Sequence, residues 1–214
     1  MAELNIEQIV AQVLAEMKGA EAPKAAAPAK AAGGAIPAKS RVAMLTALEN
    51  YEIQEYPIPT LGDDDILVKV EGCGVCGTDA HEFKRDPFGL IPLVLGHEGT
   101  GEVVAIGEGV TVDTKGDPIK VGDKIVTSVL LCGHCDYCRR YPELPNLCAN
   151  LGVYGLINED DVHFNGWFAE YILVRKNSSI FVVNGMSEYA RDGRNSNSAL
   201  LLSLIHISEP TRRY

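Results

Sequence analysis

Residues 96–110, GHEGTGEVVAIGEGV, carry the clearest sign of how this chain folds. The run Gly101–Ile106 is apolar and rich in β-branched side chains, and it enters the tight turn Gly107-Glu108-Gly109, as a strand does. Many short strands separated by glycine turns are typical of a barrel or sandwich. We therefore expect a mainly β domain with short helices (α+β) over residues 41–184. Similar runs are Ile66–Val70, Lys124–Val129 and Trp167–Val174.

Composition and charge limit the classes of partner. The 214 residues include 29 acidic and 19 basic side chains, and the net charge of −10 argues against nucleic acid and anionic membranes as partners. No apolar run approaches the roughly 20 residues that span a bilayer, and the chain does not start like a signal peptide. We expect a soluble, cytoplasmic protein, in which the clustered Cys-x-x-Cys spacings among the six cysteines indicate metal ligands rather than disulfides.

The first 40 residues differ in character from the rest. Residues 19–40 are almost entirely Ala, Pro, Gly and Lys, which predicts a linker. Within 1–18, six apolar residues are spaced to form one stripe of an amphipathic helix. An isolated helix this short is marginal in water, so we expect residues 3–18 to bind a partner. The stripe consists of Ile6, Ile9, Val10, Val13, Leu14 and Met17.

The β pattern stops near Val183. We interpret residues 185–201 as the start of a segment whose continuation is missing. Residues 202–212, LSLIHISEPTR, resemble a translated sequencing adaptor, so we expect residues 202–214 to be a non-native tail.

The strongest chemical signal is Cys132-Gly-His-Cys135-Asp-Tyr-Cys138, followed by Cys148. Four thiolates close a tetrahedral shell around Zn²⁺ and leave no position for water or substrate, so we expect a structural zinc site. Disulfides are the alternative, but loop positions this close would strain such a bond. His134 lies inside the loop and is expected to be a bystander.

A second set of residues combines three ligand types. Cys76, His97 and Glu98 offer a thiolate, an imidazole and a carboxylate, all of which Zn²⁺ accepts. A fourth position would remain for water or substrate. Open zinc lowers the pKa of a bound hydroxyl and polarises a carbonyl, as the interconversion of an alcohol and its aldehyde or ketone requires.

The residues that follow Cys76 fit supporting roles. Asp79 is suited to orient a histidine ligand from behind. Thr78 and His81 could pass the alcohol proton to solvent. Each residue alone has an ordinary structural explanation, but together they favour a catalytic zinc site.

The same region also satisfies the dinucleotide pattern G-x-G-x-x-G through Gly72, Gly74 and Gly77. That fingerprint needs a long helix that begins at its last glycine. Pro87 and Pro92 interrupt the following segment, which lacks helical apolar periodicity, so we reject this interpretation.

Together these motifs resemble the zinc-dependent medium-chain alcohol/polyol dehydrogenases. The resemblance implies a GroES-like barrel with a zinc-binding lobe, two Zn²⁺ ions, NAD(P)(H) in the full-length enzyme, a small alcohol, aldehyde or polyol substrate, and a homo-oligomer. It implies that Cys76 and His97 bind the catalytic zinc and that Glu98 is a ligand or near neighbour. The matching segments are Gly96-His97-Glu98-x-x-Gly101-x₅-Gly107-x-x-Val110, Cys76-Gly-Thr-Asp, the four-cysteine lobe and Trp167-Phe-Ala-Glu-Tyr171.

Two features depart from the family pattern. The gap between Cys138 and Cys148 is two residues longer than usual, which makes Cys148 the least typical structural ligand. No fingerprint of the nicotinamide-binding Rossmann domain follows Val183, so we expect this chain to be a truncated enzyme that is inactive alone.

Residues 1–18 with their linker resemble the encapsulation peptides of bacterial microcompartment cargo enzymes. This resemblance implies a shell or cargo protein as partner and a location in the microcompartment lumen. A coiled-coil oligomerisation tag is the alternative. For residues 41–184, the alternative to an enzyme is a non-catalytic, zinc-stabilised GroES-like binding or scaffold module.

Overall fold

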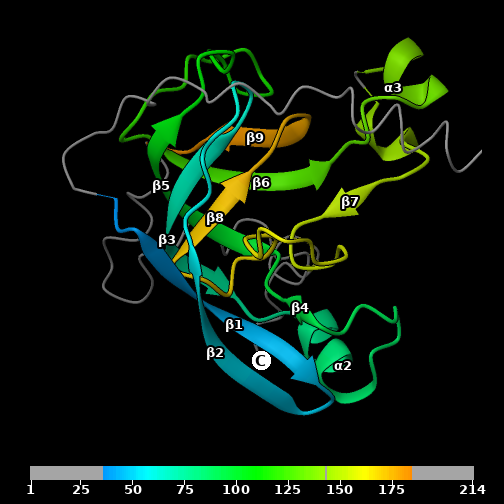
Figure 1. Ribbon diagram of the computed structural model, residues 1–214. Helices are drawn as coiled ribbons and strands as arrows, with labels where there is room; N and C mark the ends of the chain where they lie inside the picture. Colours follow the sequence, from blue (N-terminus) through cyan, green and yellow to red (C-terminus); the bar gives the residue numbers. More distant parts are fainter. Residues whose placement is uncertain (1–35, 143, 185–214) are drawn as a thin grey trace, which may run out of the picture.

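Short antiparallel strands account for most of the regular structure in residues 36–142 and 144–184, which are the residues that the computed structural model describes (Figure 1). The prediction of a mainly β fold with short helices is therefore confirmed. In chain order the elements are β1 (Lys39–Ala47), β2 (Asn50–Pro57), β3 (Ile66–Gly74), α2 (Gly77–Arg85), β4 (Leu93–Val94), β5 (Glu98–Ile106), β6 (Lys124–Leu130), α3 (Asp136–Arg140), the 3₁₀ helix η1 (Pro145–Leu147), β7 (Gly152–Val153), β8 (Tyr171–Val174) and β9 (Ser178–Val182).

The strands form two sheets that join into one curled surface. One sheet has the order β2-β1-β4, and the other has the order β7-β6-β5-β3-β8 with β9 paired to β6. The sheets meet where β1 passes the residues before β8. There the Ala43 N–H donates to Phe168 O (2.8 Å), and the Glu170 N–H donates to Arg41 O (3.0 Å). These bonds produce the half-barrel seen in Figure 1.

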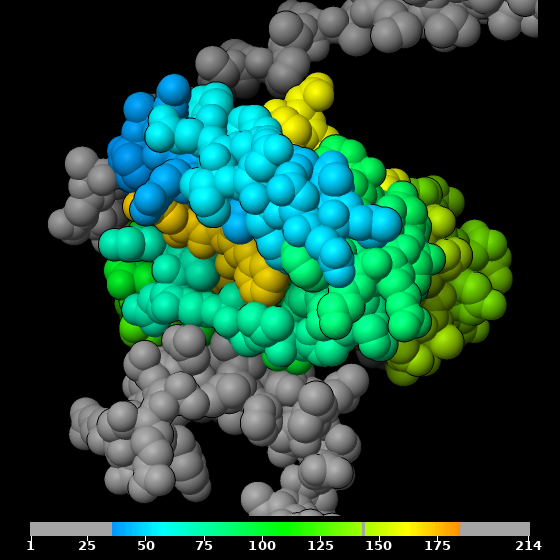
Figure 2. Space-filling view, turned by 90° about the horizontal axis from the view of Figure 1, so that it is seen from below, coloured from blue at the N-terminus to red at the C-terminus, as the bar shows by residue number. Residues whose placement is uncertain are grey.

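Helices α2 and α3 lie at different ends of this half-barrel. Figure 1 shows α2 beside the turn of the β1–β2 hairpin, low in the view, and α3 at the upper right. Stacking of Tyr51 on Phe83, with ring centroids 5.4 Å apart, fixes α2 to the hairpin. In the space-filling view the blue and cyan hairpin covers one face, while the yellow-green region of α3 projects at the edge (Figure 2). The two predicted zinc sites are therefore separate regions of the fold.

Trp167 is the largest side chain in the core and shapes the start of β5. Its indole is 1% exposed, and the Nε1–H donates to Thr127 Oγ1 at 3.2 Å. The ring lies directly on Gly99, where any Cβ would overlap the indole. Glycine is therefore needed directly after Glu98, and the close packing fixes the strand end that carries two of the predicted metal ligands.

The β domain begins earlier than the sequence indicated. β1 starts at Lys39, inside the range 19–40 that was expected to be linker, and Ile36 packs against the core. The reason is non-local, because β1 is held by its register with β2, where Lys39 pairs with Pro57. The alanine- and proline-rich composition of residues 19–40 does not indicate that their last two residues pair with β2. The expected helix 1–18, most of the linker, residues 185–201 and the tail 202–214 lie outside the described residues.

Helix α2 begins at Gly77, and the sequence did not predict it. Its buried residues are Asp79 and Glu82, so the inward face is polar and produces no apolar periodicity. The helix ends at Arg85 after nine residues, too short for the dinucleotide fingerprint that starts at Gly72. Neither α2 nor any other helix within residues 36–142 and 144–184 has the length and apolar character needed to cross a membrane.

Candidate metal centres

Four cysteine sulfurs converge in the lobe around α3. The Sγ atoms of Cys132, Cys135, Cys138 and Cys148 all lie within 4.8 Å of one another. The Cys132–Cys138 pair is 3.8 Å apart and the Cys135–Cys138 pair is 3.4 Å apart, well beyond the roughly 2.05 Å of a disulfide. All four thiols are free. This arrangement fits tetrahedral coordination of one metal ion better than it fits disulfide pairs.

The local backbone holds these sulfurs in place. Cys135 caps α3, and its Sγ accepts from the Cys138 N–H at 3.4 Å, while Cys148 Sγ accepts from the Cys132 N–H at the same distance. Hydrogen bonds, above all the one from the His134 backbone N–H, lower the pKa of Cys132 to about 5. Burial and the neighbouring thiols raise the pKa of Cys138 to about 12. The lobe thus favours thiolates but concentrates their negative charge, which a bound cation would neutralise.

His134 does not join the cluster. Its Nδ1 lies 2.8 Å from the Cys132 carbonyl oxygen, and the side chain is exposed. The cluster that could hold a metal contains the four cysteines alone. The interpretation of His134 as a bystander agrees with this geometry.

The second cluster brings together residues far apart in the sequence. Donor atoms of Cys76, His97 and Glu98 all lie within 4.8 Å of one another. Cys76 precedes the first residue of α2, Glu98 is the first residue of β5, and His97 directly precedes it. Glu98 is only 7% exposed. One thiolate, one imidazole and one carboxylate could supply three ligands to a zinc ion and leave a fourth position open.

Asp79 connects the two halves of this cluster. It is 2% exposed, and its carboxylate accepts from the Cys76 N–H (2.8 Å) and the Gly96 N–H (3.3 Å). Its Oδ1 also lies 3.4 Å from His97 Nδ1, which is longer than an ordinary hydrogen bond. One carboxylate therefore sets the positions of both ligand-bearing segments and faces the ring nitrogen that a metal would leave free.

The electrostatics of this second cluster favour a charged pair. Burial alone would lower the pKa of His97, but Asp79, with Cys76, raises it to about 9. Burial would raise the pKa of Cys76, but hydrogen bonds from the Thr78 backbone N–H and from His97 outweigh it and lower the pKa. The thiolate form of Cys76 is thus stabilised, and a metal ion would displace the proton on His97.

The proposed proton relay is only partly assembled. Thr78 Oγ1 lies 3.7 Å from Cys76 Sγ, so its hydroxyl borders the cluster. His81 is exposed one turn further along α2 and is not part of the cluster. Its role in the relay stays a prediction.

Gly74 is a residue whose importance the sequence did not reveal. It pairs with Glu98 across β3 and β5, and a Cβ there would overlap Glu98 Oε2. The isolated glycines around Cys73 were a usable signal, since glycine within a strand often marks a close approach.

Comparison with known proteins supplies the family. Residues 62–184 match the family model described as the alcohol dehydrogenase GroES-like domain. The chain belongs to the zinc-dependent medium-chain dehydrogenases. The half-barrel is therefore a GroES-like domain, and the resemblance noted from the motifs is confirmed.

Individual relatives agree with this family. The chain is 37% identical over 131 residues to a sorbitol dehydrogenase of Halalkalibacterium halodurans, covering 60% of this chain and 34% of the relative. It is 40% identical over 126 residues to an L-threonine 3-dehydrogenase of Symbiobacterium thermophilum, covering 57% and 32%. The crystal structure of an alcohol dehydrogenase from Thermotoga maritima superposes with a TM-score of 0.61 at 31% identity, covering 69% and 41%. This dehydrogenase chain spans about a third of the length of these curated relatives.

Proposed function

We propose that the protein is the zinc-binding catalytic part of a dehydrogenase that interconverts an alcohol or polyol with its aldehyde or ketone, using NAD(P)(H). The observation that carries this proposal is the convergence of Cys76, His97 and Glu98, with Asp79 behind them. A scaffold stabilised by the four-cysteine lobe alone would not need this second cluster.

The residues present fit a zinc ion. His97 Nδ1 is buried without a hydrogen-bond partner, although Asp79 Oδ1 faces it at 3.4 Å. That contact is suited to tighten when the other ring nitrogen binds a metal, as in carboxylate–histidine–zinc arrangements. In the proposal Cys76, His97 and Glu98 hold a catalytic zinc. The four cysteines, Cys132, Cys135, Cys138 and Cys148, hold a structural zinc.

Each residue then has a defined task. Zinc bound at the cluster supplies Lewis acidity, which polarises a carbonyl and lowers the pKa of an alcohol hydroxyl. Asp79 keeps His97 in one orientation. Thr78, whose hydroxyl borders Cys76, takes the proton of the alcohol, and His81 on the exposed side of α2 passes it to solvent. A bound nicotinamide would supply the acceptor for the hydride of the alcohol carbon, so the oxidation would need no other oxidant.

Activity of the complete reading frame tests the function. We expect a protein that continues the native frame beyond Leu201 to oxidise alcohols or polyols with NAD(P), and Cys76→Ser to abolish turnover. Thr78→Val should reduce kcat by about 100-fold, because general acid–base help contributes on that order. A folded protein with zinc at the cluster and no nicotinamide-dependent turnover on any alcohol, polyol or carbonyl would favour the scaffold alternative.

In this proposal the 214-residue chain by itself oxidises no alcohol. Hydride transfer requires the nicotinamide to be held against the reacting carbon, and positioning supplies much of the rate. Steady NAD(P)-dependent turnover by the purified chain would show that this expectation is wrong.

The amphipathic residues 3–18 support a second, independent proposal about location. Burial of six apolar side chains in a groove of a shell or cargo protein would give a modest, reversible association that delivers the enzyme to a microcompartment lumen. Residues 1–20 fused to a fluorescent reporter should form puncta in cells that assemble microcompartments, and Ile9→Glu with Val13→Glu should disperse them. Diffuse fluorescence of the unaltered fusion contradicts targeting. A discrete oligomer without shells would support the coiled-coil alternative.

A further inference from the structure

The loop formed by residues 155–168 makes a hydrogen bond to each of the three residues before His97. The Phe168 N–H donates to Leu95 O at 2.9 Å, and the Trp167 N–H donates to Gly96 O at 2.9 Å. The third bond comes from a side chain: the Val94 N–H donates to Glu159 Oε1 at 2.8 Å. The loop 155–168 thus clamps three successive residues before the metal ligands, and of its three bonds only that of Glu159 depends on side-chain identity. The Gly96 N–H is held separately by the Asp79 carboxylate.

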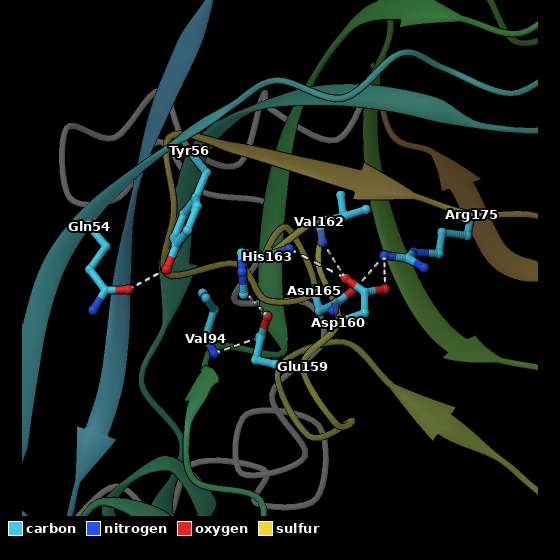
Figure 3. Close-up of polar contacts among 9 residues, drawn as sticks. All are labelled: Gln54, Tyr56, Val94, Glu159, Asp160, Val162, His163, Asn165 and Arg175. Carbon is cyan, nitrogen blue, oxygen red and sulfur yellow. Dashed lines mark hydrogen bonds and ion pairs between the residues drawn. The ribbon is translucent and has the colours of Figure 1, made fainter.

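Glu159 is itself held rigidly. Its side chain is 9% exposed, and its second oxygen lies 3.3 Å from His163 Nδ1. The His163 ring packs on Tyr56 of β2, with centroids 4.1 Å apart. Figure 3 shows Glu159 between Val94 and His163, with Tyr56 on the outer side of the histidine. The Glu159 carboxylate therefore connects β4 to the loop 155–168 and, through His163, to β2.

The remainder of the loop is anchored independently. Arg175 Nη2 lies 2.6 Å from Asp160 Oδ2 and donates to Asn165 Oδ1 at 2.9 Å (Figure 3). The loop that presents Glu159 is thus fixed on both sides of His163. A buried carboxylate on a loop anchored in this way restricts the movement of the strand that it contacts.

We propose that Glu159 is a positioning residue for the metal cluster, acting through Val94 to fix the segment that places His97 and Glu98. The inference rests on the proposed catalytic zinc. Metal–ligand distances tolerate errors of only about 0.2 Å, so a small displacement of the Val94–Gly96 segment weakens binding. The four-cysteine lobe makes no use of this clamp and serves as an internal control.

The test compares three variants of the 214-residue chain. Glu159→Ala removes the acceptor for the Val94 N–H, whereas Glu159→Gln keeps a carbonyl oxygen at that place. Glu170→Ala is the matched control, because the Glu170 carboxylate also accepts a backbone N–H, that of Arg41 at 3.0 Å, but does not touch residues 94–97. Zinc affinity of each site is measured by chelator competition, and the visible spectrum of Co²⁺ in the second cluster reports ligand geometry.

We expect Glu159→Ala to weaken metal binding at the second cluster by about 10-fold and to change its Co²⁺ spectrum, since outer groups of a metal site have effects of this order. Glu159→Gln should recover most of the affinity, and Glu170→Ala should behave as wild type. The four-cysteine site should stay unchanged in all three. If Glu159→Ala does not fold, His163→Gly removes the partner of the carboxylate and tests the same clamp.

The outcomes separate this inference from the proposed function. Wild-type protein that binds metal only in the four-cysteine lobe would overturn both. Wild-type protein that binds two metals, together with Glu159→Ala whose affinity and Co²⁺ spectrum are unchanged, would overturn the positioning role alone. Equal weakening of both metal sites would show a general loss of stability and would likewise refute the inference.

Discussion

Gly74→Ala offers a selective way to move Glu98 without altering any predicted ligand. The new Cβ would overlap Glu98 Oε2 and lie 3.2 Å from Glu98 Cβ. The carboxylate oxygen must then retreat by about 1 Å to reach an ordinary contact distance of roughly 3.5 Å. That movement is several times the tolerance of a metal–ligand bond. Gly74 does not have a positive φ, so alanine itself causes no backbone strain there.

We expect Gly74→Ala to lower the zinc affinity of the second cluster by about 10- to 100-fold, or roughly 1.4 to 2.7 kcal/mol. Gly77→Ala is the matched control, because it lies on the other side of Cys76 and its Cβ would meet nothing within 4 Å. Chelator competition on both variants measures the affinity, and urea unfolding measures stability. If Gly74→Ala binds zinc at the cluster as tightly as Gly77→Ala does, Glu98 is not a direct ligand and the reasoning fails.

Further predictions concern the fold and the second site. Trp167→Phe should lower the free energy of unfolding by about 1 to 3 kcal/mol, because it strands the buried Thr127 hydroxyl; adding Thr127→Val should recover part of that loss in a double-mutant cycle. Cys135→Ser should release one zinc on mild chelation and leave the other bound, as metal analysis can show; loss of both would contradict independent sites. Burial tends to raise the pKa of Asp113, but three backbone N–H groups hold it below its usual value, so this stability contribution is present above about pH 4 and is lost as the pH falls further. Acid unfolding of Asp113→Asn should therefore depend less on pH than that of wild type, and equal slopes would contradict the assignment.

The sequence predicted which residues form the two clusters of ligand side chains better than it predicted the bounds of the strands and helices. Cysteine spacing around Cys132–Cys138 is local, so four converging sulfurs could be inferred from the chain alone. The GHE motif and the Cys76 motif were paired by ligand type, and the pairing of β3 with β5 supplies the physical reason why they meet.

Contacts that depend on distant partners were not predictable in this way. The strands β1 and β2 were missed because each is defined by the other's register. Helix α2 was missed because its buried face is acidic. Glu159 gave no sign of its contact with Val94, since 65 residues separate them and a single sequence contains no record of that approach.

Metal analysis of the purified chain and one variant shows directly whether two independent metal centres exist. We expect two zinc ions per wild-type chain. We expect one in the variant that combines Cys76→Ser, His97→Ala and Glu98→Gln, with thiolate–metal absorption of the four-cysteine lobe intact. One zinc in both proteins, or none in the variant while it remains folded, would show that the chain does not hold two independent metal centres.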